Sequence, residues 1–159
     1  ERSFLDGQVH YRPIQEAPLW KAVRILEGSS ANPEPLLREA FVDVEGVEAA
    51  FLFGSTVTGE DHEESDVDLM VLEGSGFDGK RMLRQLSEVG LVLGREVNTV
   101  RYSLQGLADR MGDRTHPAWG FVRGVITGPK RWIAGSPQAV APLAAAAGLQ
   151  MPELHGAEA

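Results

Sequence analysis

The chain has 159 residues, of which 43% are hydrophobic and 24% charged, and these values are typical of a single soluble globular domain. A net charge of −8 argues against a broad nucleic-acid-binding surface, because phosphate binding normally requires an excess of Lys and Arg. The absence of cysteine excludes disulfides, thiolate zinc sites and cysteine nucleophiles. No apolar run approaches the ~18 residues of a membrane span. We therefore expect a cytoplasmic protein.

The first 14 residues are expected to form a segment of their own. Loose alternation of apolar residues around the turn signal Asp6-Gly7 predicts a β-hairpin within residues 3–14. The chain begins at Glu1, without Met and without a signal-peptide pattern. We therefore interpret it as a fragment of a longer protein.

Two helices are predicted between this segment and the first strand of the main domain. Apolar residues recur at helical spacing between Pro18 and Gly28, which are typical start and stop residues. A second apolar stripe predicts a helix over residues 35–44, and Gly46 closes it.

The most specific pattern in the chain links a Gly-Ser pair to two aspartates. The apolar run 47–53 predicts a strand that stops at Gly54-Ser55, and ten residues later a second apolar strand carries Asp66 and Asp68 at its start. Residues two apart in a strand point the same way, so both carboxylates are expected to face one spot.

This arrangement suits a metal-bound phosphate. Paired carboxylates repel each other unless a cation lies between them, and Mg²⁺ (or Mn²⁺) binds one or two carboxylates together with phosphate oxygens. Asp66 and Asp68 are therefore the predicted metal ligands, and the N–H groups and hydroxyl of Gly54-Ser55 would bind the phosphates. The alternative is a solvated acidic loop, because residues 60–64 add four further acids.

Helices and strands alternate through the rest of the chain. Predicted elements are a helix over 80–92, a strand over 96–102, a helix over 103–111 capped by Ser103, a helix from 116 to about 124–128, an edge strand over 130–135 and an Ala-rich helix over 136–148. This alternation favours an α/β or α+β sheet over a helical bundle. We expect a main domain over residues 15–135 and a C-terminal helix and tail over 136–159.

The string Gly54-Ser55, ten residues, Asp66-Val67-Asp68 resembles the signature of the DNA polymerase β-type nucleotidyltransferase superfamily, and its spacing is most similar to the minimal nucleotidyltransferase branch. Residues 93–98 and 100–103 resemble the third core strand of minimal domains fused behind an ArsR-like winged helix. The resemblance implies an α+β fold, a short mixed sheet with packed helices, and Mg²⁺-dependent transfer of a nucleoside monophosphate from an NTP such as ATP. It also implies that residues 1–14 belong to an upstream DNA-binding module; the alternative is a native N-terminal arm.

The third strand departs from the family pattern. Relatives supply a third carboxylate there, whereas this chain has Asn98, and an amide cannot act as a general base at neutral pH. Glu96, two residues earlier on the same face, is the alternative base. Thr58 stands where relatives often have Arg, so Arg95 and Arg101 are candidate phosphate-binding cations, with surface salt bridges as the alternative.

Two functions of different classes follow. The first is a nucleotidyltransferase whose acceptor, by resemblance, is the tyrosine hydroxyl of a partner toxin, a tRNA end or a small molecule. The second, favoured by Asn98, is a nucleotide-sensing effector domain of a winged-helix transcription regulator that transfers slowly or not at all. A structural interaction module is a third reading, and a homodimer is left open.

Overall fold

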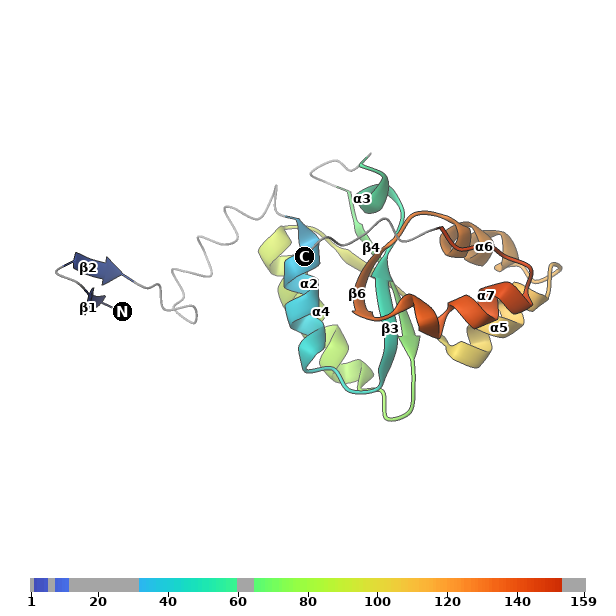
Figure 1. The fold of residues 1–159 in the computed structure, drawn as a ribbon, viewed down its shortest axis with the longest axis horizontal. Coiled ribbons are helices and arrows are strands. Elements are labelled where there is room, and N and C mark those ends of the chain that lie inside the picture. Colours follow the sequence, from blue (N-terminus) through green and yellow to red (C-terminus); the bar gives the residue numbers. More distant parts are fainter. Residues whose placement is uncertain (1, 6–7, 12–31, 60–64, 153–159) are drawn as a thin grey trace.

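A computed structural model of the chain describes residues 2–5, 8–11, 32–59 and 65–152 (Figure 1). Strands β1 (Arg2–Leu5) and β2 (Gln8–Tyr11) pair antiparallel, with Arg2 opposite Tyr11, which confirms the predicted hairpin. The helix predicted between Pro18 and Gly28 and the acidic residues 60–64 lie outside the described residues.

Four strands form a mixed sheet in the order β5-β4-β3-β6, which confirms the predicted short mixed α+β sheet. The strands are β3 (Val47–Leu52), β4 (Val67–Glu73), β5 (Val97–Ser103) and β6 (Arg131–Gly135). Strand β3 runs antiparallel to both β4 and β6, whereas β4 and β5 are parallel. The central strands β3 and β4 bury apolar side chains on both faces, and helices cover both sides of the sheet.

The helices form one layer on each face of the sheet (Figure 1). Helices α2 (Pro33–Val42) and α4 (Gly79–Leu93) pack on the face that receives Leu69 and Val71 of β4. Met70 and Leu72 of β4 point to the opposite face. This face is covered by α5 (Leu104–Gly112), α6 (Trp119–Thr127) and α7 (Ala141–Ala146). Two cores therefore result from the period-two alternation of the strands.

Side-chain caps set the starts of three helices. The Ser103 hydroxyl accepts a hydrogen bond from Gly106 N at 3.0 Å, as predicted for the start of α5. Asn32 and Asp78 cap α2 and α4 in the same way, accepting from Glu34 N at 3.1 Å and Arg81 N at 2.9 Å. Each cap contributes about 1 kcal/mol to helix stability.

The predicted Ala-rich helix over 136–148 is divided in two. A 3-10 turn over Pro137–Ala139 precedes the shorter helix α7. Pro142 lacks a backbone N–H and lies in the first turn of α7, where that hydrogen bond is not needed, so it starts a helix and cannot continue one from residue 137. Among the described residues no helix is both long and apolar enough to cross a bilayer.

Lys130 connects the end of α6 to the edge strand β6. Its Nζ donates hydrogen bonds to the carbonyls of Ile126 at 2.8 Å and Gly128 at 2.7 Å, and lies 5.8 Å from the centre of the Phe51 ring. Burial of this ammonium lowers the pKa of Lys130 from 10.5 to about 8.

The free energy of unfolding is expected to rise between about pH 8 and 10.5, because the unfolded state binds more protons than the folded state in that window. Denaturant unfolding of Lys130→Met across this range should show a smaller rise than the wild type. Lys80→Met, at an exposed position of α4, is the matched control and should keep the wild-type slope. Equal pH slopes for wild type and Lys130→Met would contradict the prediction.

Candidate active site

Three strand ends meet at one end of the sheet. Strand β4 runs antiparallel to β3 and parallel to β5. The end of β3 therefore lies at the same edge of the sheet as the starts of β4 and β5. Phe53 N donates to Asp68 O at 3.2 Å, and Asp68 pairs with Asn98 in the register of β4 and β5. The structure thus brings together Asp68 of β4, Asn98 of β5 and Gly54, which follows the end of β3.

Gly54 forms the corner that faces the Asp68 carboxylate. Its backbone has φ 73° and ψ −152°, a conformation that is essentially restricted to glycine. A Cβ atom on Gly54 would lie 2.9 Å from Asp68 Oδ2. The Asp68 carboxylate can therefore approach the Gly54 backbone this closely because glycine has no side chain. Helix α3 (Ser55–Thr58) begins directly after the corner, with half-buried Ser55 at its first position.

The second carboxylate, Asp66, is held by Asn98. Asn98 Nδ2 donates a hydrogen bond to Asp66 Oδ2 at 3.0 Å. Strand alternation places Asp66 and Asp68 on the face of the sheet that Asn98 shares, as predicted. The Asn98 amide therefore orients the Asp66 carboxylate.

The donor set fits a hard divalent cation. Asp66 is exposed and Asp68 half-buried, so ligands can reach both carboxylates from one side. Mg²⁺ usually takes only one or two protein carboxylates and completes its shell with waters and phosphate oxygens. Within the described residues no cluster of three or more acidic, His or Cys side chains is suited to hold a metal.

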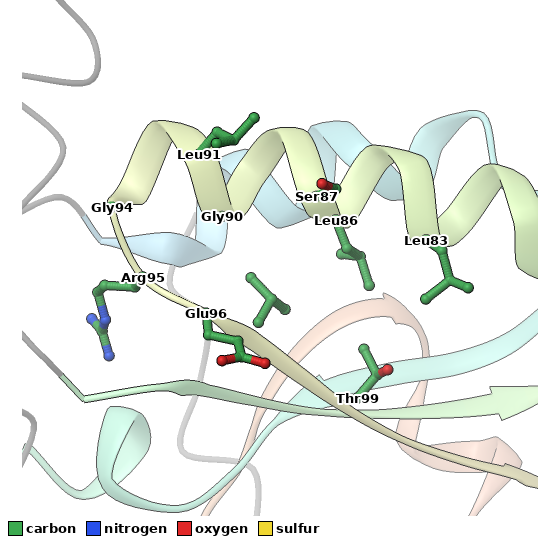
Figure 2. A pocket seen from close by; sticks show the side chains of 10 residues that line it. Leu83, Leu86, Ser87, Gly90, Leu91, Gly94, Arg95, Glu96 and Thr99 are labelled. Atoms are coloured by element: carbon green, nitrogen blue, oxygen red, sulfur yellow. The ribbon is translucent and has the colours of Figure 1, made fainter.

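Glu96 directly precedes β5, two residues before Asn98. Its carbonyl accepts a hydrogen bond from Val67 N at 2.8 Å, so the pairing of β4 and β5 extends back to Glu96. Alternation puts its side chain on the same face as that of Asn98, and Figure 2 shows it turned away from α4. Glu96 is exposed and remains a candidate base.

The two predicted phosphate-binding arginines have different surroundings. Arg95 Nε donates to Ser65 O at 2.5 Å and its Nη2 to Asp66 O at 3.4 Å, so Arg95 holds the backbone that leads into β4. Arg101 Nε pairs with Glu73 Oε1 at 2.6 Å, at the far end of β4, and its guanidinium lies 5.4 Å from the centre of the Phe77 ring. The structure does not bring Arg101 to the acidic pair, and its surroundings match the salt-bridge alternative.

An aromatic pair borders the acidic pair, and our sequence reasoning missed it. Phe53 packs with Met70 and therefore lies on the face of Asp68, and the Phe121 ring of α6 meets it at 5.8 Å between centroids. The position of Phe53 directly before Gly54 is a signal that could have identified it. No local pattern could have identified Phe121, because its helix lies far along the chain.

A groove on the other face of the sheet adjoins this group at Arg95 and Glu96. It has a volume of about 490 Å³ and lies between α4 and β5 (Figure 2). Its walls are largely apolar, with Leu83, Leu86 and Val97 among the lining residues. Arg95 and Glu96 line its end, whereas Gly54, Asp66 and Asp68 do not contribute to it.

Comparison with known families agrees with this geometry. Residues 36–110 match the sequence model of the polymerase beta nucleotidyltransferase family, and this span contains Gly54, Asp66, Asp68 and Asn98. Residues 36–110 are a polymerase β-type nucleotidyltransferase domain. The superfamily expected from the Gly-Ser and Asp-x-Asp pattern is thereby confirmed.

Three solved structures are similar to this chain, and the first of them shares its fold. A toxin–antitoxin structure with AMP-PNP is 19% identical, with a TM-score of 0.50 over 72% of this chain and 82% of that chain. A mutant MntA-HpeT toxin–antitoxin structure is 18% identical, with a TM-score of 0.46 over 71% and 78%. A tri-AMPylated Shewanella oneidensis HEPN toxin in complex with an MNT antitoxin is 15% identical, with a TM-score of 0.42 over 80% and 82%. None of the curated proteins compared by sequence matches the chain.

Proposed function

We propose that this chain is a Mg²⁺-dependent nucleotidyltransferase that moves a nucleoside monophosphate from an NTP to an acceptor hydroxyl. The observation that carries the proposal is the closeness of the Asp68 carboxylate to the Gly54 backbone, where a Cβ would lie 2.9 Å from Asp68 Oδ2, with Asp66 held by Asn98 on the same face. This corner lies within a nucleotidyltransferase domain.

Asp66 and Asp68 would hold the metal together with the NTP phosphates. Bound Mg²⁺, or Mn²⁺ on the same ligands, neutralises the charge on the reacting phosphate oxygens. The backbone N–H groups after Gly54 and the Ser55 hydroxyl would bind the β- and γ-phosphates, because the glycine leaves room for a close approach. Asn98 holds Asp66 in orientation through its 3.0 Å hydrogen bond.

The acceptor oxygen forms a bond to the α-phosphorus while the bond from that phosphorus to the bridging oxygen breaks. Pyrophosphate leaves with the bonding electron pair, and the acceptor proton passes to a base. Glu96 is the carboxylate on the shared face that is available for this proton, whereas Asn98 has no usable proton affinity. The acceptor is a hydroxyl on a protein, a tRNA end or a small molecule.

Transfer of radiolabel from the α-phosphate of ATP tests the proposal. ATP is the first nucleotide to try, because a structural neighbour contains AMP-PNP, an ATP analogue. Label should appear on an added protein, tRNA or small-molecule acceptor, and chelation of divalent ions should prevent it. Absence of transfer to every acceptor class, with Mg²⁺ and Mn²⁺ both tried, would reject the enzyme assignment.

Asn98→Asp is expected to raise the transfer rate by about 10²-fold, because it restores a carboxylate that can accept a proton. Without metal the new acid lies beside Asp66, so the variant should require a higher Mg²⁺ concentration for full folding stability. Transfer rates measure the first effect, and thermal unfolding over a Mg²⁺ titration measures the second. Glu96→Gln is the companion variant: a rate unchanged by Glu96→Gln and unchanged by Asn98→Asp would show that neither position limits proton transfer.

A nucleotide sensor is the second candidate, favoured by the amide at position 98 in place of an acid. In that function the domain binds NTP through the same residues, and residues 1–14, proposed as a wing-like segment, connect it to a DNA-binding module. Tight AMP-PNP and ATP binding with no turnover under the conditions above would favour the sensor.

A further inference from the structure

An exposed aromatic ring stands on the site's face of the sheet. Phe121 of α6 is 44% exposed, whereas the Phe53 ring beneath it is 8% exposed. Their ring planes meet at 74° with centroids 5.8 Å apart. An edge-to-face contact of this kind fixes both rings relative to each other. Phe121 is thus an apolar ring that contacts Phe53 on one side and is open to solvent on the other.

Phe53 connects this ring to the metal-binding carboxylate. The Phe53 N to Asp68 O hydrogen bond of 3.2 Å continues the register of β3 and β4, so the two residues are directly opposite. Side chains of opposite residues on one face have Cβ atoms about 4.5–5.5 Å apart. The Phe121 ring therefore lies on the face of the sheet that carries Asp68 and is separated from it by the Phe53 side chain, a span that the ribose and base of a phosphate-bound nucleotide can bridge.

Among the described residues, the surface of α6 beside Phe121 carries small side chains. Helix α6 turns Val122, Val125 and Ile126 into the core, and Phe121 lies beside this stripe. Gly120 and Gly124 flank Phe121 on the same helix, and a Cβ on either would meet no atom within 4 Å. A flat ligand can therefore lie against the ring without displacing a side chain of α6.

We propose that Phe121 is the platform on which the nucleobase of the bound NTP stacks, with Phe53 holding the ring in place. The proposal rests on the proposed function, since it requires a nucleotide whose phosphates lie at Gly54 and Asp68. A base offers its π face to an aromatic ring irrespective of its identity, so this contact supplies affinity and orientation of the nucleotide.

Calorimetric titration with two ligands separates the base from the phosphates. Phe121→Ala should weaken Mg²⁺–AMP-PNP binding by about tenfold or more and leave Mg²⁺–tripolyphosphate binding unchanged. Phe121→Leu keeps apolar volume without a ring and should also weaken AMP-PNP binding, whereas Phe121→Trp should preserve it. Leu91→Ala removes a 68% exposed apolar side chain from α4 on the other face and is the matched control.

Three other results of these titrations would each reject the stacking platform, the proposed function or both. Wild-type affinity of Phe121→Ala for AMP-PNP would reject the platform and leave the proposed function intact. If Phe121→Ala binds neither AMP-PNP nor tripolyphosphate, the ring stabilises the fold and does not bind the base. This result also rejects the platform. Failure of the wild-type protein to bind either ligand with Mg²⁺ would reject the proposed function, and the platform with it.

Discussion

Asp68→Asn is expected to lower kcat/KM for nucleotidyl transfer by about 10³-fold or more, because stabilisation of the reacting phosphate by a held metal is worth several kcal/mol. The change removes one charge and keeps the shape of the side chain beside Gly54. Mg²⁺-dependent binding of AMP-PNP should weaken in parallel. Label transfer from ATP and calorimetry measure the two effects on one preparation.

The matched control for this change is Glu73→Gln on the same strand. Glu73 lies at the far end of β4 and pairs with Arg101 at 2.6 Å, so the variant loses one acid outside the proposed site. Exposed ion pairs contribute about 0–1 kcal/mol, and transfer should stay near the wild-type rate. Equal activity losses in Asp68→Asn and Glu73→Gln would attribute the effect to net charge and contradict a specific metal ligand.

Gly54→Ala is expected to reduce transfer by about 10²-fold and to destabilise the fold by about 1–3 kcal/mol, because it combines backbone strain with a displaced carboxylate. The new Cβ would lie 2.9 Å from Asp68 Oδ2 at a residue with φ 73°. Asp68 must therefore rotate away from its position beside the phosphate corner. Thermal unfolding and the transfer assay report the two consequences separately.

Gly76→Ala separates the effect of backbone strain at a positive φ from the effect of the close contact between a new Cβ and Asp68. Gly76 has φ 74°, and a Cβ there would meet nothing within 4 Å, in the loop between β4 and α4 at the other end of the sheet. It should cost about 1–2 kcal/mol of stability with no loss of transfer by the folded protein. If Gly54→Ala behaves like Gly76→Ala in both assays, the corner does not position Asp68.

Local patterns predicted most of the fold. The predicted strand over 47–53 corresponds to β3 at Val47–Leu52, and the predicted helix over 80–92 to α4 at Gly79–Leu93. These elements have long apolar runs or stripes with clear stop residues, so their periodicity alone identifies them. The Ala-rich segment was less tractable, because composition favours a helix while Pro142 breaks it.

The sequence by itself determined that Asp66 and Asp68 share a face and that the chain can turn tightly at Gly54. Asp66 and Asp68 share a face because they are two residues apart, and Gly54 allows the corner because it lacks a side chain; both are properties of a few adjacent residues. Only the tertiary structure decided that Asn98 holds Asp66, that Arg101 lies elsewhere and that Phe121 meets Phe53. Those contacts join residues about 30 or more positions apart, and they depend on strand order, register and helix packing, which no local pattern specifies.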